Sequence, residues 1–472
     1  MNAALRMFAP HVYSARRCAL CERVRTGLIL LPGHADSPMN FTANPYPFRQ
    51  DSTFLYFIGI NRPAGAGLAA VIDTETGHTL LFGEDDTPEQ KLWHGEAPPI
   101  AELAQQAGCE GVRAFSTLAD YLASRQTQGH TVHFVPPCRA HTALLLAGLL
   151  DLPAHQIAHH ASEPLIQAVV ALREIKEDSE INQICDALSV ARKMHIAAMQ
   201  AARPGIREAD LVAEMRRVLC RAGMHEAYAC ITTRRGDILH NNDYGGQLKA
   251  GDIVLNDAGA ATAMGYASDV TRCFPASGRF DTRQRELYDI VLDAQAACIQ
   301  AMAPGVVYAN IHRLAAHRIA TGLASLGIFR GNADEIVETG AYAICFPHGV
   351  GHQLGLDVHD MESLGEDRVG YDARHIRSQQ PGATRLRLGK PLQRNMVVTV
   401  EPGVYFPEHL IRQWQAEQRH SQLIDYQRLQ SFVGLGGIRL EDVVLVTDSS
   451  ACVLGPAIPK HPNEVLEIMR TG

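Results

Sequence analysis

The chain has 472 residues, of which 46% are hydrophobic and 20% charged, and its formal net charge is -8. This length exceeds one ordinary hydrophobic core and predicts two or three domains. The negative charge, without a basic tail, argues against a nucleic-acid partner. No apolar run approaches the roughly 18 residues of a membrane span. Eleven scattered cysteines favour reduced thiols, and the N-terminus lacks a signal-peptide pattern, so we expect a cytoplasmic protein.

The first part of the chain alternates strand-like and helix-like segments. Short apolar runs bounded by Gly, Pro or Asp predict strands at 28–31, 68–72, 80–82 and 132–135. Helices are expected over 98–107 and 140–150. We therefore expect a smaller α/β domain over residues 1–165, and we find no catalytic constellation in it.

The remainder, residues 166–472, has longer helical patterns followed by strands. Apolar residues recur at spacings of three and four over 181–198, which predicts a helix that ends before Pro204 and Gly205. The same period recurs over 207–221, where Gly223 suits a C-terminal cap. Strands are expected from Ile231 onward, with two more helices at 290–302 and 311–326. These patterns predict an α+β domain.

A predicted β-hairpin at 251–275 carries two aspartates, Asp257 and Asp269. A turn centred on Ala263 would place them directly opposite each other, with Cβ atoms about 4.5–5.5 Å apart. Two ionised carboxylates at that distance repel, whereas a pair of divalent cations about 3.5–4 Å apart would hold both. The alternative is a loop aspartate and a surface aspartate that meet by chance. Residues further along the chain favour the metal site.

Three histidines, His348, His352 and His359, fall within a dozen residues and are interleaved with glycines. This is not the pattern of an amphipathic helix. The glycines would let the backbone fold closely around a site. The HExxH motif is absent, so a helix-borne zinc site of that kind is not expected.

Two glutamates, Glu401 and Glu441, each follow a short apolar run. Either one alone is explained as a charge at a strand edge. Together with the two aspartates they carry about four negative charges at neutral pH, which two divalent ions would neutralise. Four carboxylates and one imidazole suit Mn²⁺, with Co²⁺, Fe²⁺ or Zn²⁺ possible.

In order along the chain, these candidate ligands resemble the five-ligand pattern of the "pita-bread" di-metal peptidases. The similarity is strongest to the Xaa-Pro aminopeptidase (aminopeptidase P) and prolidase family, in the segments DAGA, YASDVTRCFP, HGVGHQLGLDVHD, VVTVEPGVYF and GIRLED. The segments NPYPFRQD and YFIG resemble the N-terminal domain of that family. The resemblance implies a C-terminal pita-bread (creatinase/methionine-aminopeptidase-like) catalytic domain after a smaller α/β domain. It also implies a homo-oligomer, either a dimer or a tetramer.

The resemblance further implies roles for individual residues. The metal ligands would be Asp257, Asp269, His352, Glu401 and Glu441. Glu401 would also accept and pass on the proton of the attacking water, and His359 would stabilise the oxyanion at the scissile carbonyl.

Four further residues are implied to border the substrate. His240 would lie near the scissile nitrogen, and His348 would line the pocket for the residue after the cut. Arg439 and Tyr405 fall at positions next to the site. A structural role is the alternative for each of the three residues His240, Arg439 and Tyr405.

The implied activity is release of the N-terminal residue from proline-containing peptides with proline second. Prolidase activity on Xaa-Pro dipeptides is the alternative, because many bacterial aminopeptidases P have tryptophan where this chain has Gln353. The long segment 361–390 could shape the substrate entrance. Methionine aminopeptidases usually lack the N-terminal domain, creatine-hydrolysing relatives lack the metal ligands, and binding modules of this fold lose them, so these three alternatives are disfavoured.

Overall fold

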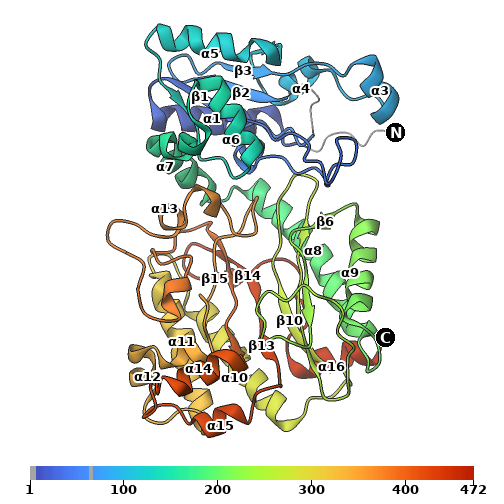
Figure 1. Cartoon of the computed structure of the whole chain (residues 1–472), viewed down its shortest axis with the longest axis vertical. Coiled ribbons are helices and arrows are strands. Elements are labelled where there is room, and N and C mark those ends of the chain that lie inside the picture. The colour runs from blue at the N-terminus through green and yellow to red at the C-terminus, as the bar shows by residue number, and fades with distance from the viewer. Residues whose placement is uncertain (1–6, 63–66, 472) are drawn as a thin grey trace. The chain divides into compact units, whose positions relative to one another are not determined.

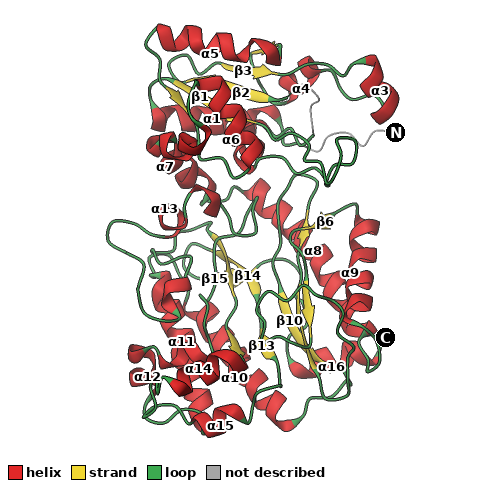
Figure 2. Cartoon of the chain, in the orientation of Figure 1, coloured by secondary structure: helices red, strands yellow, loops and turns green. Residues whose placement is uncertain are grey.

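The computed structural model describes residues 7–62 and 67–471. The chain forms two compact units. One contains the residues up to Arg173 together with Ala263–Gly265 and Met361–Arg368, and the other contains the remainder. Figure 1 labels the helices and strands along the chain, and Figure 2 shows that both units combine helices with strands. None of the described helices is both long enough and apolar enough to cross a bilayer.

The N-terminal unit is built on a five-stranded sheet in the order β4-β3-β2-β1-β5. The strands are β1 (Leu28–Pro32), β2 (Ala69–Asp73), β3 (Thr79–Phe82), β4 (Gly111–Arg113) and β5 (Val132–His133). The helices are α1 (Pro10–Val24), α2 (Ser52–Ile58), α3 (Pro88–His94), α4 (Ile100–Gln106), α5 (Leu118–Thr127), α6 (Ala140–Leu150) and α7 (Glu163–Arg173). Strands β1 and β2 are antiparallel, whereas β5 pairs with β1 in parallel. All four predicted strands and both predicted helices of this region are present.

Two pairs of long helices frame the C-terminal unit: α8 (Asp178–Ala201) with α9 (Glu208–Ala222), and α10 (Thr282–Ala301) with α11 (Tyr308–Ser325). All four were predicted, and Gly223 ends α9 with a left-handed φ of 64°. The other helices of the C-terminal region are α12 (Ala333–Thr339), α13 (Glu366–Gly370), α14 (Glu408–Ala416), α15 (Tyr426–Gln430) and α16 (Pro462–Arg470).

Two three-stranded sheets lie between these helices, in the orders β10-β8-β7 and β11-β14-β15. Two short ladders, β12-β13 and β6-β9, complete the strands. The bounds are β6 (His225–Glu226), β7 (Ile231–Thr233), β8 (Ile253–Asp257), β9 (Ala260–Ala261), β10 (Thr271–Pro275), β11 (Val397–Val400), β12 (Gly403–Tyr405), β13 (Gly437–Arg439), β14 (Asp442–Val446) and β15 (Ala451–Val453).

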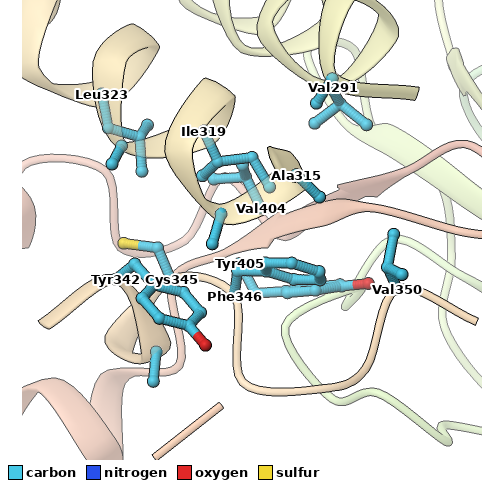
Figure 3. Close-up of a cluster of buried hydrophobic side chains, with 14 of the residues drawn as sticks. Val291, Ala315, Ile319, Leu323, Tyr342, Cys345, Phe346, Val350, Val404 and Tyr405 are labelled. Atoms are coloured by element: carbon cyan, nitrogen blue, oxygen red, sulfur yellow. The ribbon is translucent and has the colours of Figure 1, made fainter. Parts of the chain in front are cut away.

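Strand β8 is buried on both faces, as its apolar sequence predicts. Ile253 and Leu255 belong to the large core that α10 and α11 cover, whereas Val254 belongs to the cluster beneath α8 and α9. This alternation is the two-residue period of a strand. Figure 3 shows part of the larger core, where Phe346 and Tyr405 lie close together. Helix packing on both sides therefore fixes the strand ends from which the site is built.

The predicted register of the β8–β10 hairpin is wrong. Asp257 pairs with Thr271, not with Asp269, and Ala261 pairs with Ala267. The turn is therefore centred one residue later than predicted, and Asp269 precedes β10 instead of lying within it. When the turn centre moves by one residue, the pairing partner of Asp257 changes by two residues. Because side chains alternate between the two faces of a sheet, the face predicted for the two aspartates is unchanged.

Candidate metal centre

The five predicted ligands lie at or just beyond strand ends in the C-terminal unit. Asp257 is the last residue of β8, and Asp269 lies two residues before β10. Glu401 directly follows β11, and Glu441 lies between β13 and β14. His352 lies in a loop beside β11. Four of the five are buried, and the Glu401 side chain is 18% exposed.

The imidazole of His352 is aimed at the carboxylates by its own backbone. Its Nδ1–H donates to the Gln353 carbonyl at 3.0 Å, which leaves Nε2 to face the site. Nε2 lies 3.4 Å from Oδ2 of Asp269 and 3.7 Å from Oε1 of Glu401. Ligand atoms of Asp269, His352 and Glu441 all lie within 4.8 Å of one another. The structure thus brings together residues that are far apart in the sequence.

The histidine loop lies tightly against β11, as its glycines predict. The His352 amide donates a hydrogen bond to the Thr399 hydroxyl at 3.1 Å, and the Thr399 amide donates to the His352 carbonyl at 2.9 Å. A Cβ atom at Gly351 would collide with the Thr399 carbonyl and the Tyr308 hydroxyl. Only glycine allows this approach, so the loop position of His352 depends on Gly351.

Two polar residues that the sequence analysis did not select orient the carboxylates. The Tyr228 hydroxyl lies 2.5 Å from an oxygen of Asp257 and 2.5 Å from an oxygen of Asp269. The Thr271 hydroxyl donates to Glu441 at 2.8 Å. Thr271 follows Asp269 by two residues, a spacing that could have suggested it, whereas no motif surrounds Tyr228.

Arg439, Tyr405 and His348 form a hydrogen-bonded chain beside the carboxylates. Arg439 donates to the Tyr405 hydroxyl at 2.9 Å, and Nε2 of His348 lies 2.8 Å from the same oxygen. Nδ1 of His348 lies 2.8 Å from the Gly349 carbonyl. Burial and the nearby Arg439 charge lower the pKa of His348 to about 3. The imidazole is therefore neutral, and both of its nitrogens are engaged.

The other two predicted histidines differ in their surroundings. The ring of His359 lies 4.1 Å, between centroids, from that of His352. The next residue, Asp360, forms a buried ion pair with Lys176 at 3.0 Å, which anchors this part of the loop. His240 lies exposed in a turn.

The crowded carboxylates do not share one ionisation behaviour. Burial raises the pKa of Glu401 to about 7, and burial together with Asp269 and Glu401 raises the pKa of Glu441 well above its usual value. Burial also raises the pKa of Asp257, against the Arg439 charge. Burial opposes ionisation of Asp269 too, but the hydrogen bond from His352 lowers its pKa overall. Without cations, this site holds protons at neutral pH.

The donor set fits a pair of divalent cations. Carboxylate oxygens and one oriented imidazole suit hard to borderline ions. The two charges of each ion would replace the protons that the crowded carboxylates otherwise retain. The hydrogen bonds from Arg439, Tyr228 and Thr271 hold the carboxylates in place, as residues around a metal centre commonly do.

Comparison with known families matches both parts of the chain. The family model "Metallopeptidase family M24" matches residues 182–448, which include all five candidate ligands. The model "Aminopeptidase P, N-terminal domain" matches residues 13–133.

Individual proteins match along nearly the whole chain. The Xaa-Pro dipeptidase of Homo sapiens is 30% identical, covering 96% of this chain and 92% of its own length. The Xaa-Pro aminopeptidase of Escherichia coli K12 is 28% identical, covering 97% of both. The solved structure of Pseudomonas aeruginosa aminopeptidase PepP has a TM-score of 0.80 at 27% identity and covers 98% of this chain and 99% of its own. These matches confirm the predicted fold class.

Proposed function

The chain belongs to metallopeptidase family M24, and we propose that it is an Xaa-Pro aminopeptidase, which releases the N-terminal residue from peptides with proline second. The observation that carries the proposal is the convergence of Asp269, His352 and Glu441 beside Asp257 and Glu401. The names of the relatives and the match to the aminopeptidase P N-terminal domain support the substrate class.

The proposed ligands of two divalent ions are Asp257, Asp269, His352, Glu401 and Glu441. When bound, such ions lower the pKa of a water molecule and polarise the scissile carbonyl. Mn²⁺ is the proposed ion, because four of the five ligands are carboxylates. Co²⁺, Fe²⁺ and Zn²⁺ are the alternative ions for the same five ligands.

Glu401 is the proposed proton carrier. Its carboxylate keeps some exposure and lies among the proposed metal ligands, 3.7 Å from Nε2 of His352, so it would face an attacking water. It would accept a proton from the attacking water and deliver it to the departing nitrogen. His359 would donate a hydrogen bond to the carbonyl oxygen as negative charge develops there.

The chain of Arg439, Tyr405 and His348 is proposed to form a fixed wall of the substrate pocket. Because each group is hydrogen-bonded to the next, the wall would position the residue after the cut without rearranging. The neutral His348 suits contact with an uncharged proline ring. His240, which is exposed, is proposed to lie near the scissile nitrogen of the bound substrate.

An activity assay tests the proposal. The purified Mn²⁺-loaded protein is incubated with two substrates, an Xaa-Pro-Yaa tripeptide and an Xaa-Pro dipeptide. Release of the first residue from the tripeptide is the expected result. Matched peptides with alanine in the second position measure the proline preference. Cleavage of alanine peptides as fast as proline peptides would contradict the proposed specificity.

Xaa-Pro dipeptidase activity is the second candidate, because the human Xaa-Pro dipeptidase is among the most similar relatives. Cleavage of the dipeptide alone would establish it. Gln353, whose side chain donates to the Val369 carbonyl at 3.2 Å, is the residue to replace by tryptophan in a comparison of the two activities.

Oligomeric state and location extend the proposal. The family resemblance supports a homo-oligomer, a dimer or tetramer, which light scattering of the purified protein would measure. The cysteines are all outside disulfides, which supports a reducing compartment such as the cytoplasm.

A further inference from the structure

Three potential metal ligands converge in the N-terminal unit, and none of them belongs to the candidate metal centre. His34 follows β1 by two residues, Asp51 directly precedes α2, and Cys138 lies between β5 and α6. One ligand atom from each lies within 4.8 Å of the others. We propose that these three side chains bind a single transition-metal ion, with Zn²⁺ the best match.

The distances are close to those of a tetrahedral zinc site. Nε2 of His34 lies 3.7 Å from Oδ2 of Asp51 and 3.9 Å from Sγ of Cys138. Zinc bonds of about 2.0–2.3 Å at tetrahedral angles place such ligand pairs roughly 3.3–3.6 Å apart. Shifts of a few tenths of an ångström would bring each of these two pairs to that spacing, and the ligand atoms of Asp51 and Cys138 lie within 4.8 Å of each other. Imidazole, thiolate and carboxylate together favour zinc over manganese or magnesium.

His34 is held as metal-ligating histidines are held. Its ring is buried, and Nδ1 lies 3.1 Å from the Arg49 carbonyl. The Nδ1–H donates to that oxygen, so the lone pair lies on Nε2, the nitrogen that faces Asp51 and Cys138. Its backbone amide donates to Oε1 of Gln50 at 2.5 Å. The orientation of the ring is thus fixed by contacts that do not use Nε2.

The other two ligands leave room for an ion. One oxygen of Asp51 accepts from the Phe54 amide at 2.9 Å and caps α2, and the second oxygen faces His34. The Cys138 side of the cluster is exposed, so water can supply a fourth ligand. Burial lowers the pKa of His34 overall, although the Asp51 carboxylate and the hydrogen bond to the Arg49 carbonyl act in the opposite direction. The imidazole is neutral at pH 7, the form that binds a metal.

The expected role is structural. An ion at this position would join the end of β1, the start of α2 and the start of α6, three segments distant in sequence. Because the ion would bind the folded chain and not the unfolded one, it would stabilise the N-terminal unit. It takes no part in peptide hydrolysis, so it stands or falls separately from the proposed function.

Co²⁺ titration of the full-length, metal-free protein tests the proposal. None of the five ligands in the C-terminal unit contains sulfur, so a thiolate-to-cobalt charge-transfer band cannot arise there. We expect this band to appear, with a final intensity that corresponds to one thiolate-bound Co²⁺ per chain, whatever amount of Co²⁺ the C-terminal ligands also bind. Zn²⁺ should displace it. The readout is independent of peptidase activity.

Three variants locate the band. Cys138→Ser should abolish it, and because Cys138 is exposed this change leaves the fold intact. Asp51→Asn keeps a capping side chain on α2 but removes the charged ligand, and should weaken binding about 10–100-fold. Cys18→Ser is the matched control, because Cys18 is also an exposed cysteine of this unit and the band should persist without it.

Results of two kinds in the titrations would overturn the proposal, and a third result, in Asp51→Asn, would overturn its geometry. One is the absence of a thiolate band while the C-terminal ligands are saturated with Co²⁺. The other is a band that survives Cys138→Ser or disappears in Cys18→Ser. If Asp51→Asn bound Co²⁺ as tightly as the wild type, the Asp51 carboxylate would not be a ligand, and the proposed three-ligand site would be wrong.

Discussion

The guanidinium of Arg439 donates a hydrogen bond to Oδ2 of Asp257 at 2.5 Å, and both groups are buried. The other oxygen of Asp257 accepts from Tyr228. Both oxygens of this carboxylate therefore have a fixed direction before any ion binds. An arrangement of this kind lowers the reorganisation needed when the site is filled.

Arg439→Lys is expected to lower kcat/KM about 100-fold, which corresponds to about 2.7 kcal/mol. Arg439 reaches Asp257, Tyr405 and Thr271 at once, through three different nitrogens. Lysine keeps the charge but cannot reproduce this fork. Steady-state kinetics on the Xaa-Pro-Yaa tripeptide measure the loss. Arg285→Lys, an exposed position, should have wild-type activity, and an equally active Arg439→Lys enzyme would contradict the prediction.

Tyr228→Phe should weaken metal binding about 10–100-fold while the fold is retained. The substitution removes only the hydroxyl that joins Asp257 to Asp269 and leaves the ring in place. Calorimetric titration with Mn²⁺ gives the affinity directly. Tyr244→Phe is the matched control, because its hydroxyl bonds to the Cys230 carbonyl instead. Equal Mn²⁺ affinities of the two variants would exclude this role for Tyr228.

Chelation should abolish peptidase activity, and Mn²⁺ should restore it with release of protons. In the metal-free protein, burial raises the pKa of Glu401 to about 7 and that of Glu441 well above its usual value, so both carry protons at and below pH 7. Cations compete with those protons, and the apparent metal affinity should therefore increase as the pH rises through 7. Titrations in two buffers of different ionisation enthalpy reveal the released protons. A heat of Mn²⁺ binding that is the same in both buffers would contradict the predicted competition between cations and protons.

The sequence predicts most of the residues that converge here, because each lies in its own short motif, and Asp257, Glu401 and Glu441 each follow an apolar run. The approach of the histidine loop to β11 follows from Gly351, which the sequence also displays. The partner of Asp257 was missed by two residues, because the turn is centred on Met264, directly before Gly265 with its left-handed φ of 92°, and not on Ala263. Tyr228 could not be predicted, because it lies 29 residues from Asp257 in an unremarkable segment. Its role arises only from tertiary packing.

The buried His195 should make the metal-free protein less stable in acid. Burial lowers its pKa to about 3, and its ring lies between the Ala258 carbonyl at 3.1 Å and the Asn256 amide at 2.9 Å. The unfolded chain, with a histidine pKa of about 6.5, therefore takes up this proton first. The stabilisation is complete above pH 6.5 and is lost as the pH falls toward 3, by at most about 1.4 kcal/mol per pH unit.

His195→Gln removes this titration and keeps a polar side chain, so the free energy of unfolding should be lower at pH 7 by about 1–3 kcal/mol. The difference from wild type should shrink steadily below pH 6.5, because only the wild-type protein loses the histidine contribution. Denaturant unfolding of both metal-free proteins between pH 7 and 4.5 measures it. His225→Gln, at an exposed position, should follow the wild-type curve. Parallel curves for His195→Gln and wild type would show that some other group controls the acid sensitivity.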